Sequence, residues 1–180
     1  MRIIASLLIL AGAGLIAGPM AAARIEKGAA RPAAHADVTD AKGATVATAR
    51  FTQMEGGLRL VVDAKGLPPG MHGIHLHGVG LCEAPDYKSA GAHWNPMGRM
   101  HGLESPQGAH AGDLPNLRIG ADGSGHLDTM IKGATLTGGH EPVLDADGTA
   151  LVIHADPDDN HTDPAGNSGG RIACGVVRAG

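Results

Sequence analysis

The alternation of histidine and apolar residues around His75 and His77 constrains the fold of this chain most. The two histidines alternate with Ile74 and Leu76. Side chains of a β-strand point to its two faces in turn. The pattern therefore predicts a strand over residues 71–78 that presents two imidazoles together on one face and apolar side chains on the other.

The rest of the chain is typical of a protein built from short strands and turns. Its 180 residues are enough for one domain with a core, and 29 glycines with 2% aromatic residues disfavour a helical bundle. Turn residues separate eight segments of strand character, at 36–41, 44–54, 58–64, 71–78, 117–121, 126–131, 150–155 and 171–177. We therefore expect an all-β protein, an eight-stranded β-sandwich or barrel with two long functional loops, at 79–113 and 156–170.

The N-terminus has the pattern of a secretory signal peptide. Met1-Arg2 precedes an apolar run over 3–17, and small residues end at Ala23. The run is about 15 residues long, short of the ~20 that a membrane-spanning helix needs. We expect a signal peptide over 1–23, a flexible lead-in over 24–35, a folded domain over 36–178, and a periplasmic or secreted product.

The charge balance limits the class of partner. The whole chain carries a net charge of −4, and loss of residues 1–23 removes one charge, that of Arg2, which gives −5. Nucleic acids and anionic membrane surfaces bind clustered Lys and Arg. We therefore expect neither a nucleic-acid partner nor a stable association with a membrane. A small anionic substrate remains compatible with this charge.

Cys82 and Cys174 are the two cysteines of the chain. An even pair in an exported protein favours a disulfide. The alternative is thiolate ligation of a metal, but neither cysteine lies in a Cys-x-x-Cys pair or beside a histidine. A disulfide here would tie the start of the first long loop to the last strand.

Seven residues have the character of metal ligands. They are His75, His77, His93, His101, His110, Asp113 and His154, the last of which closes the apolar run 151–153. Seven ligands are too many for one tetrahedral site, so the sequence indicates two metals. Imidazole-rich ligation with one carboxylate suits copper and zinc far better than calcium or magnesium.

The strand pattern and the loop spacing divide these ligands into two groups. His75, His77 and His154 come from strands, and with His93 they would make a four-imidazole copper site. His93, His101, His110 and Asp113 follow one another in the loop, and tetrahedral zinc accepts three nitrogens and one carboxylate. His93 is required twice, so we expect its ring to bridge the metals through its two nitrogens. His35, His72, His126, His140 and His161 lack such a pattern, and for His72 we expect a structural hydrogen bond.

Four segments closely resemble one family. They are GMHGIHLH at 70–77, SAGAHWNP at 89–96, HAGDL at 110–114 and GNSGGRIACG at 166–175. In this order, from about residue 36 to 177, they resemble copper,zinc superoxide dismutase. CEAPDYK at 82–88 and DLPNL at 113–117 are most similar to the exported bacterial type.

The resemblance implies a Greek-key fold and a function. It implies copper on His75, His77, His93 and His154, zinc on His93, His101, His110 and Asp113, and a disulfide between Cys82 and Cys174. Arg171 would guide the substrate superoxide, and Asp158 would link the metal sites. Superoxide would be dismuted to oxygen and hydrogen peroxide by alternating reduction and oxidation of copper bridged to a structural zinc, with proton donation by His93. The family implies a monomer or a homodimer.

Two other classes of protein use similar residues. A periplasmic module that binds or buffers copper and zinc without turnover would need the same histidines, but not Arg171 beside four nitrogens or one histidine shared by two ions. A blue-copper electron carrier would need a cysteine ligand, and neither cysteine has suitable histidine neighbours. The sequence therefore favours the enzyme. The loop 156–170 is shorter than in the eukaryotic enzymes, so a steering role beyond Arg171 is left open.

Overall fold

The computed structural model describes residues 33–180 of the chain. The expected signal peptide and residues 24–32 of the expected lead-in lie outside this range. The described residues form ten β-strands and one short 3₁₀ helix. The strands are β1 (Ala33–Asp40), β2 (Thr45–Met54), β3 (Gly57–Lys65), β4 (Gly70–His72), β5 (Ile74–His77), β6 (Leu117–Ile119), β7 (Ser124–Lys132), β8 (Ala150–His154), β9 (Arg171–Val176) and β10 (Arg178–Ala179), and the helix is η1 (Lys88–Ala90). Among these residues, no helix is long and apolar enough to cross a membrane.

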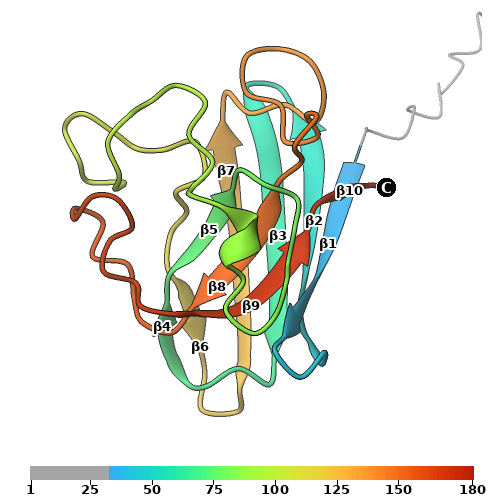
Figure 1. Ribbon diagram of the computed structural model, residues 1–180, viewed down its shortest axis with the longest axis vertical. Helices are drawn as coiled ribbons and strands as arrows, with labels where there is room; N and C mark the ends of the chain where they lie inside the picture. Colours follow the sequence, from blue (N-terminus) through green and yellow to red (C-terminus); the bar gives the residue numbers. More distant parts are fainter. Residues whose placement is uncertain (1–32) are drawn as a thin grey trace, which may run out of the picture.

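The strands form one antiparallel sheet that curls into a nearly closed Greek-key barrel (Figure 1). Its order is β4-β6-β7-β3-β2-β1-β9-β8-β5, with β10 beside β1. The two ends of this order, β4 and β5, follow one another directly in the chain, so the sheet returns to its own start. The pairs β3–β7 and β1–β9 join strands far apart in sequence, which is the Greek-key element of the topology. The all-β prediction is confirmed.

Alternate residues of the long strands fill the barrel. Val38 of β1, Phe51 of β2 and Leu60 of β3 are fully buried, while their sequence neighbours on the outer face are polar or partly exposed. Burial of one such side chain contributes roughly 1.5–3 kcal/mol. In β5, Ile74 and Leu76 join this core, so His75 and His77, which alternate with them, must face the other way.

The strand expected over 71–78 is two strands. β4 pairs with β6 and β5 pairs with β8, so the partner changes at Gly73. At this point the main chain approaches the loop after β8, since Gly73 donates its N–H to Asp156 O at 2.8 Å and a Cβ on Gly73 would lie 2.8 Å from Ser168 Cβ. This split and the additional strand β10 account for ten strands where the sequence predicted eight.

The first strand also begins earlier than expected. β1 starts at Ala33, so residues 33–35 of the expected lead-in belong to the sheet. Ala34 is buried and pairs with both Phe51 and Ala179. β10 supplies a second partner for the start of β1, and this pairing is not visible in local sequence.

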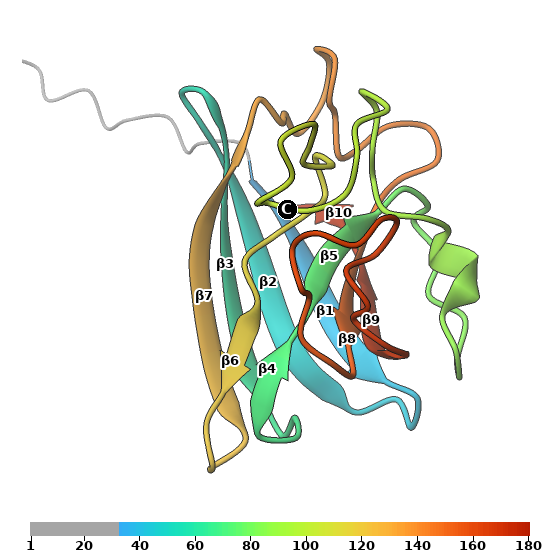
Figure 2. The ribbon, with the colours of Figure 1, turned by 90° about the vertical axis from the view of Figure 1, so that its left-hand side faces the viewer.

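The two long loops lie on the same side of the barrel, outside β5 and β8 (Figure 2). They contact each other directly, since His101 N donates to Asp163 Oδ1 at 2.7 Å and Glu104 N donates to Asn160 O at 3.3 Å. The predicted disulfide is confirmed. Cys82 and Cys174 are bonded, with Cα atoms 5.6 Å apart, so the first loop is fastened to β9.

Candidate metal centre

The sheet presents three histidines to the space beneath the loops. His75 and His77 of β5 point away from the core, and the register pairs His75 with Val152 and Ile74 with Ile153 of the neighbouring strand β8. His154 ends β8, one residue beyond Ile153. All three imidazoles are almost fully buried, because the loops cover this face of the sheet.

Main-chain contacts hold the first loop against β5. Trp94 N donates to Leu76 O at 2.8 Å, and Leu76 N donates to Gly112 O at 2.9 Å. A Cβ on Gly112 would collide with Leu76 O, so this close approach requires glycine. The buried Trp94 packs into the main core next to these contacts. His93 is thereby placed beside His77, and Asp113 beside His75.

Four nitrogen atoms in this space have no hydrogen-bond partner within the described residues. They are His75 Nδ1, His77 Nε2, His93 Nε2 and His154 Nε2, all buried. The four histidines can bring ligand atoms within 4.8 Å of one another. Buried polar atoms without a partner are rare and costly in proteins. This set therefore fits a metal ion that accepts four imidazole nitrogens, as copper does.

The other nitrogen of each strand histidine explains why the free nitrogen carries a lone pair. His75 Nε2 lies 2.7 Å from Asp158 Oδ2, His77 Nδ1 lies 2.9 Å from Gly91 O, and His154 Nδ1 lies 3.3 Å from Gly169 O. All three partners are acceptors, so the hydrogen of each neutral ring sits there. Such contacts fix the tautomer and the orientation of metal-binding imidazoles.

Burial keeps these rings neutral. Loss of hydration lowers the pKa of His77 to about 2 and the pKa of His154 to about 3, and the nearby histidines and Arg171 act in the same direction. Burial likewise lowers the pKa of His75, although its bond to Asp158 opposes the effect. Neutral imidazole is the form that binds metals.

The second group gathers three nitrogens around one carboxylate oxygen. Asp113 Oδ1 lies 3.0 Å from His93 Nδ1, 3.0 Å from His101 Nδ1 and 3.3 Å from His110 Nδ1, and the Nδ1 atoms of His93 and His110 are 3.4 Å apart. Ligands of tetrahedral zinc at their usual bond lengths are separated by about 3.3 Å. These four separations are close to that value, and ligand atoms of all four residues lie within 4.8 Å of one another, so the set fits a zinc ion.

Asp113 is held as an anion for this role. Burial alone would raise its pKa, but hydrogen bonds from His93 and from the main chain lower the pKa of Asp113 to about 2. Its outer oxygen Oδ2 accepts the N–H groups of Gly102 and His110, at 2.8 and 3.0 Å. Oδ1 is therefore directed at the three imidazoles.

Among the described residues, His93 is the one member of both groups. Its Nδ1 lies in the carboxylate group, and its Nε2 is one of the four unpartnered nitrogens. The ring is stacked obliquely on His75, with centroids 4.1 Å apart. One imidazole thus reaches both positions, as the spacing of the ligands predicted.

Asp158 connects the two groups by contacting one imidazole of each. Its Oδ2 accepts from His75 Nε2 at 2.7 Å, and its Oδ1 lies 3.1 Å from His101 Nε2. Burial would raise the pKa of Asp158, but the bonds from His75, the Asn160 N–H and His101 outweigh burial and lower it well below the usual range. The residue thus contacts one ring of each group, which is the position expected for a link between two metal sites.

Arg171 lies at the edge of the four-nitrogen group. It is the cross-strand partner of His154, and its charge contributes to the lowered pKa of His77 and His154. The guanidinium donates to Tyr87 O and to Gly91 O, both at 2.6 Å. It is half-buried, and burial lowers its pKa from the ordinary value. A fixed cation thus stands beside the set that fits copper.

The structure adds three groups that the sequence did not single out. The main-chain carbonyl of Gly91 contacts both His77 and Arg171. Asn116 holds Asp158 by two bonds to its main chain, both of 2.8 Å. Asp163 accepts the N–H of His101. No local pattern marks such residues, because their roles depend on contacts made across the fold.

Several other histidines have ordinary surroundings. His72 is buried between two carbonyls, with Nδ1 2.8 Å from His154 O and Nε2 2.9 Å from Pro68 O, so the expected structural role is confirmed. His126 is exposed beside Asp63, and His161 is exposed beside Glu104.

Fold and site together define a two-metal β-barrel protein. A model of the copper/zinc superoxide dismutase family matches residues 45–177. Superoxide dismutase (Cu-Zn) 1 of Aquifex aeolicus (strain VF5) is 43% identical over 146 residues, which cover 80% of this chain and 86% of the relative. Superoxide dismutase (Cu-Zn) of Caulobacter vibrioides (strain ATCC 19089 / CIP 103742 / CB 15) is 43% identical over 148 residues, covering 79% and 80%.

Solved structures agree with this result. The crystal structure of a SOD-like protein from Bacillus subtilis has a TM-score of 0.76 at 39% identity, covering 79% of this chain and 96% of that one. The chain belongs to the copper/zinc superoxide dismutase family. It is an oxidoreductase that dismutes superoxide and uses copper and zinc.

Proposed function

We propose that His75, His77, His93 and His154 hold the copper of this dismutase and that His93, His101, His110 and Asp113 hold its zinc. The observation that carries the proposal is the set of four buried, unpartnered nitrogens, one of which belongs to a ring whose other nitrogen faces Asp113. When bound, copper supplies alternating one-electron reduction and oxidation, and zinc supplies a fixed, redox-inert positive charge.

His93 is proposed as the proton carrier. Two superoxide anions and two protons give one oxygen and one hydrogen peroxide. The half-reaction that releases oxygen consumes no proton, so both protons must reach the peroxide formed in the other half. Nε2 of His93 faces the four-nitrogen space, and Nδ1 is occupied on the Asp113 side. The ring therefore has one nitrogen at which a proton can be taken up and then donated, which is general acid–base work by a positioned imidazole.

Arg171 is proposed to bind and orient the anionic substrate. Its guanidinium is always charged and presents several N–H donors in a rigid plane. Two of these donors are used on Tyr87 O and Gly91 O, which fixes the plane beside His154. The remaining donors can bind an anion at the copper group. An inert metal-binding module needs no such cation, so this residue favours the enzyme over a storage role.

Asp158 is proposed to orient His75 and His101 through their outer nitrogens. A carboxylate that accepts from metal-binding imidazoles fixes the rings and raises their basicity. Because one carboxylate serves a ring of each group, movement at one metal position is transmitted to the other.

We propose that the protein works outside the cytoplasm, as a periplasmic or secreted enzyme. The disulfide between Cys82 and Cys174 supports an oxidising compartment, and the pattern of residues 1–23 supports export. Superoxide is the small partner. The proposal includes no nucleic acid, no stable membrane association, and a monomer or a homodimer.

Reconstitution tests the proposed function. The chain without residues 1–23 is loaded with copper and zinc, its metal content is measured, and its inhibition of superoxide-driven dye reduction is compared with that of the same concentration of free copper. We expect the loaded protein to be far more active than free copper. Equal activity would contradict the enzyme and support a binding module.

A further inference from the structure

Arg171 is held by a short segment of the first long loop. Its two carbonyl partners, Tyr87 O and Gly91 O, lie on either side of η1, the 3₁₀ helix Lys88–Ala90. Gly91 O also contacts His77 Nδ1 at 2.9 Å. The position of the segment 87–91 therefore sets the position of the guanidinium relative to a ligand of the copper group.

Tyr87 gives this segment its shape. Its backbone is left-handed, with φ 53° and ψ 25°. This conformation is unfavourable for a residue with a Cβ. The left-handed turn directs the Tyr87 carbonyl so that it accepts both from Arg171 and from Ala90 N, the latter at 3.1 Å. Something in the surrounding structure must stabilise this residue.

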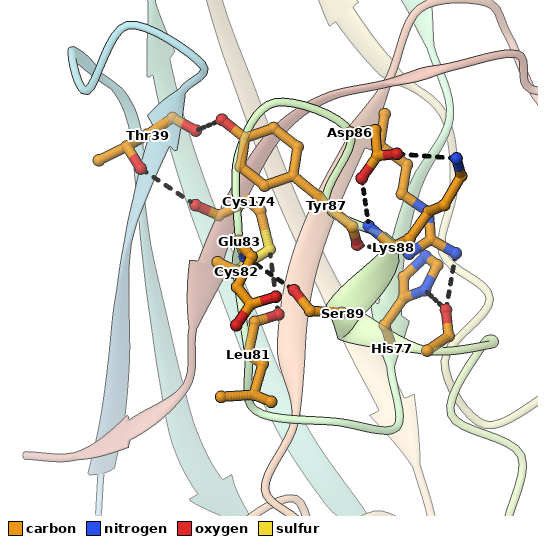
Figure 3. Close-up of a disulfide and its surroundings, with 12 residues drawn as sticks. Thr39, His77, Leu81, Cys82, Glu83, Asp86, Tyr87, Lys88, Ser89 and Cys174 are labelled. Carbon is orange, nitrogen blue, oxygen red and sulfur yellow. Dashed lines mark hydrogen bonds and ion pairs between the residues drawn. A yellow bond between two sulfur atoms is a disulfide. The ribbon is translucent and has the colours of Figure 1, made fainter.

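The side chain of Tyr87 supplies that stabilisation. The ring is 1% exposed, and its hydroxyl donates to Thr39 O of β1 at 3.0 Å (Figure 3). Thr39 pairs with Cys174, the cysteine of β9 that forms the disulfide. The phenol and the disulfide thus attach the same loop to the same corner of the barrel, the disulfide through Cys82 and the phenol at the residue that contacts Arg171.

The residues next to Tyr87 do not provide an equivalent anchor. Asp86 and Lys88 are exposed and form an ion pair with each other, with Nζ 2.7 Å from Oδ2. Exposed pairs of this kind contribute little to stability. Among the described contacts of residues 86–88, the bond from the Tyr87 hydroxyl to Thr39 O is therefore the one that links a buried side chain to the barrel.

We infer that Tyr87 is a positioning residue for substrate binding: its phenol, bonded to Thr39 O, fixes the carbonyl that holds Arg171 beside the copper group. The inference rests on the proposed role of Arg171. Tyr87 touches neither the substrate nor the metal ligands in this scheme. Its effect passes through one main-chain carbonyl to the guanidinium.

The test measures anion binding. Tyr87→Phe removes the hydroxyl and keeps the ring and the disulfide. The copper- and zinc-loaded protein is titrated with azide, and the dissociation constant is read from the visible absorption of copper, with metal content and melting temperature measured in parallel. Loss of one hydrogen bond of about 1 kcal/mol predicts an azide dissociation constant raised about three- to tenfold, with unchanged metal content.

Thr149→Val is the matched control. Thr149 is also buried and donates one hydroxyl bond to a carbonyl, Val143 O at 3.0 Å, but it lies just before β8, at the other end of that strand from His154. We expect it to lower the melting temperature by a similar amount and to leave the azide dissociation constant unchanged. An equal weakening of azide binding in both variants would assign the effect to lost stability and overturn the inference.

Arg171→Ala distinguishes this inference from the proposed role of Arg171, on which it rests. Arg171→Ala should weaken azide binding, and Tyr87→Phe should add nothing in that background, because residues that act through one another are not additive. If Arg171→Ala leaves azide binding unchanged, the proposed role of Arg171 fails and the inference fails with it. If Arg171→Ala weakens binding but Tyr87→Phe has no effect, or has the same effect in both backgrounds, the inference on Tyr87 alone is overturned.

Discussion

The two halves of the metal centre are built in different ways. Three of the four proposed copper ligands come from paired strands, β5 and β8, whose positions are set by the sheet. The four proposed zinc ligands come from one loop, residues 93–113, which contains no strand of its own. Sheet pairing holds the first group without a metal. The second group is held by loop contacts, several of which go to Asp113, itself a proposed ligand.

His93 joins these two halves. It belongs to the loop, yet its Nε2 completes the copper group. The strand half therefore depends on the loop half for its fourth ligand and for its proposed proton carrier. If zinc binds as proposed, it would matter for the reaction without redox chemistry of its own, because its ligand set would include the ring that completes the copper group.

Removal of zinc should give the largest difference between the two halves, measured as the rate of amide hydrogen exchange. The amide groups of Gly102 and His110 donate to Asp113 Oδ2, whereas that of Val152 lies in the ladder of β8. Without zinc, we expect hydrogen exchange at Gly102 and His110 to accelerate about a hundredfold while exchange at Val152 is nearly unchanged. Mass spectrometry or NMR of the two forms measures this ratio. Equal acceleration in loop and strand would contradict the comparison.

Arg171→Ala tests whether the substrate binds at the strand half of the centre. Removal of a charged hydrogen-bond donor of about 1.5–3 kcal/mol predicts a rate lowered about 10- to 100-fold. Copper and zinc content should stay unchanged, because Arg171 is in neither ligand group. Dye-reduction assays and metal analysis check both parts. An unaltered rate would reduce Arg171 to a structural brace.

Asp158→Asn tests the link between the halves. The amide has a single acceptor oxygen, so it cannot accept from both His75 and His101. We expect the affinity for each metal to fall about tenfold. Asp159→Asn is the control, since the side chain of Asp159 accepts hydrogen bonds from Thr162, His161 N and Asn167 and not from a ring of either metal group. Competition with a chelator measures the metal affinity of both variants. Equal affinities in the two would contradict the proposed role of Asp158 in orienting His75 and His101.

The smallest expected effect is a pH dependence of the metal-free protein. The pKa of His77 is lowered to about 2 and that of His154 to about 3 in the folded protein. As the pH falls, the unfolded chain therefore binds protons at these two histidines before the folded protein does. Stability is therefore complete above about pH 6.5 and declines below it, by about 1 kcal/mol per pH unit for each histidine. Asp113, with a pKa of about 2, would add a decline only below about pH 4.

Urea unfolding between pH 7.5 and 5 measures this slope. His77→Ala should make it shallower, because one of the histidines with a lowered pKa is gone. A metal-free protein whose stability is flat over this range would show that the strand histidines are hydrated, contrary to their burial.

Local sequence predicted the parts of the molecule that depend on local geometry. The alternation at 74–77 predicted which side chains enter the core and which leave it, because a strand has a period of two whatever its partners are. The ligand spacing in the loop predicted a shared His93. The disulfide followed from two cysteines in a chain with an export pattern. These features needed no knowledge of strand order.

Other features depend on contacts between distant segments and could not be predicted in this way. Gly73 splits one expected strand because β4 and β5 have different partners. β1 begins at Ala33 because Ala179 pairs with Ala34. The contacts of Gly91 O and Asn116 are made by atoms whose residue types carry no signal. The position of Asp158 was expected from family resemblance and not from local sequence. Its neighbour Asp159 has the same side chain and a different environment, so residue type alone could not distinguish the two.

The central claim is that one imidazole, His93, serves both metals, and the copper electron paramagnetic resonance spectrum tests it most directly. Spectra are recorded for the copper-loaded protein with and without zinc, and for His93→Ala under the same two conditions. The shared ring predicts that zinc changes the copper spectrum of the unaltered protein and leaves that of His93→Ala unchanged. An unaltered protein whose copper spectrum is identical with and without zinc would contradict the account.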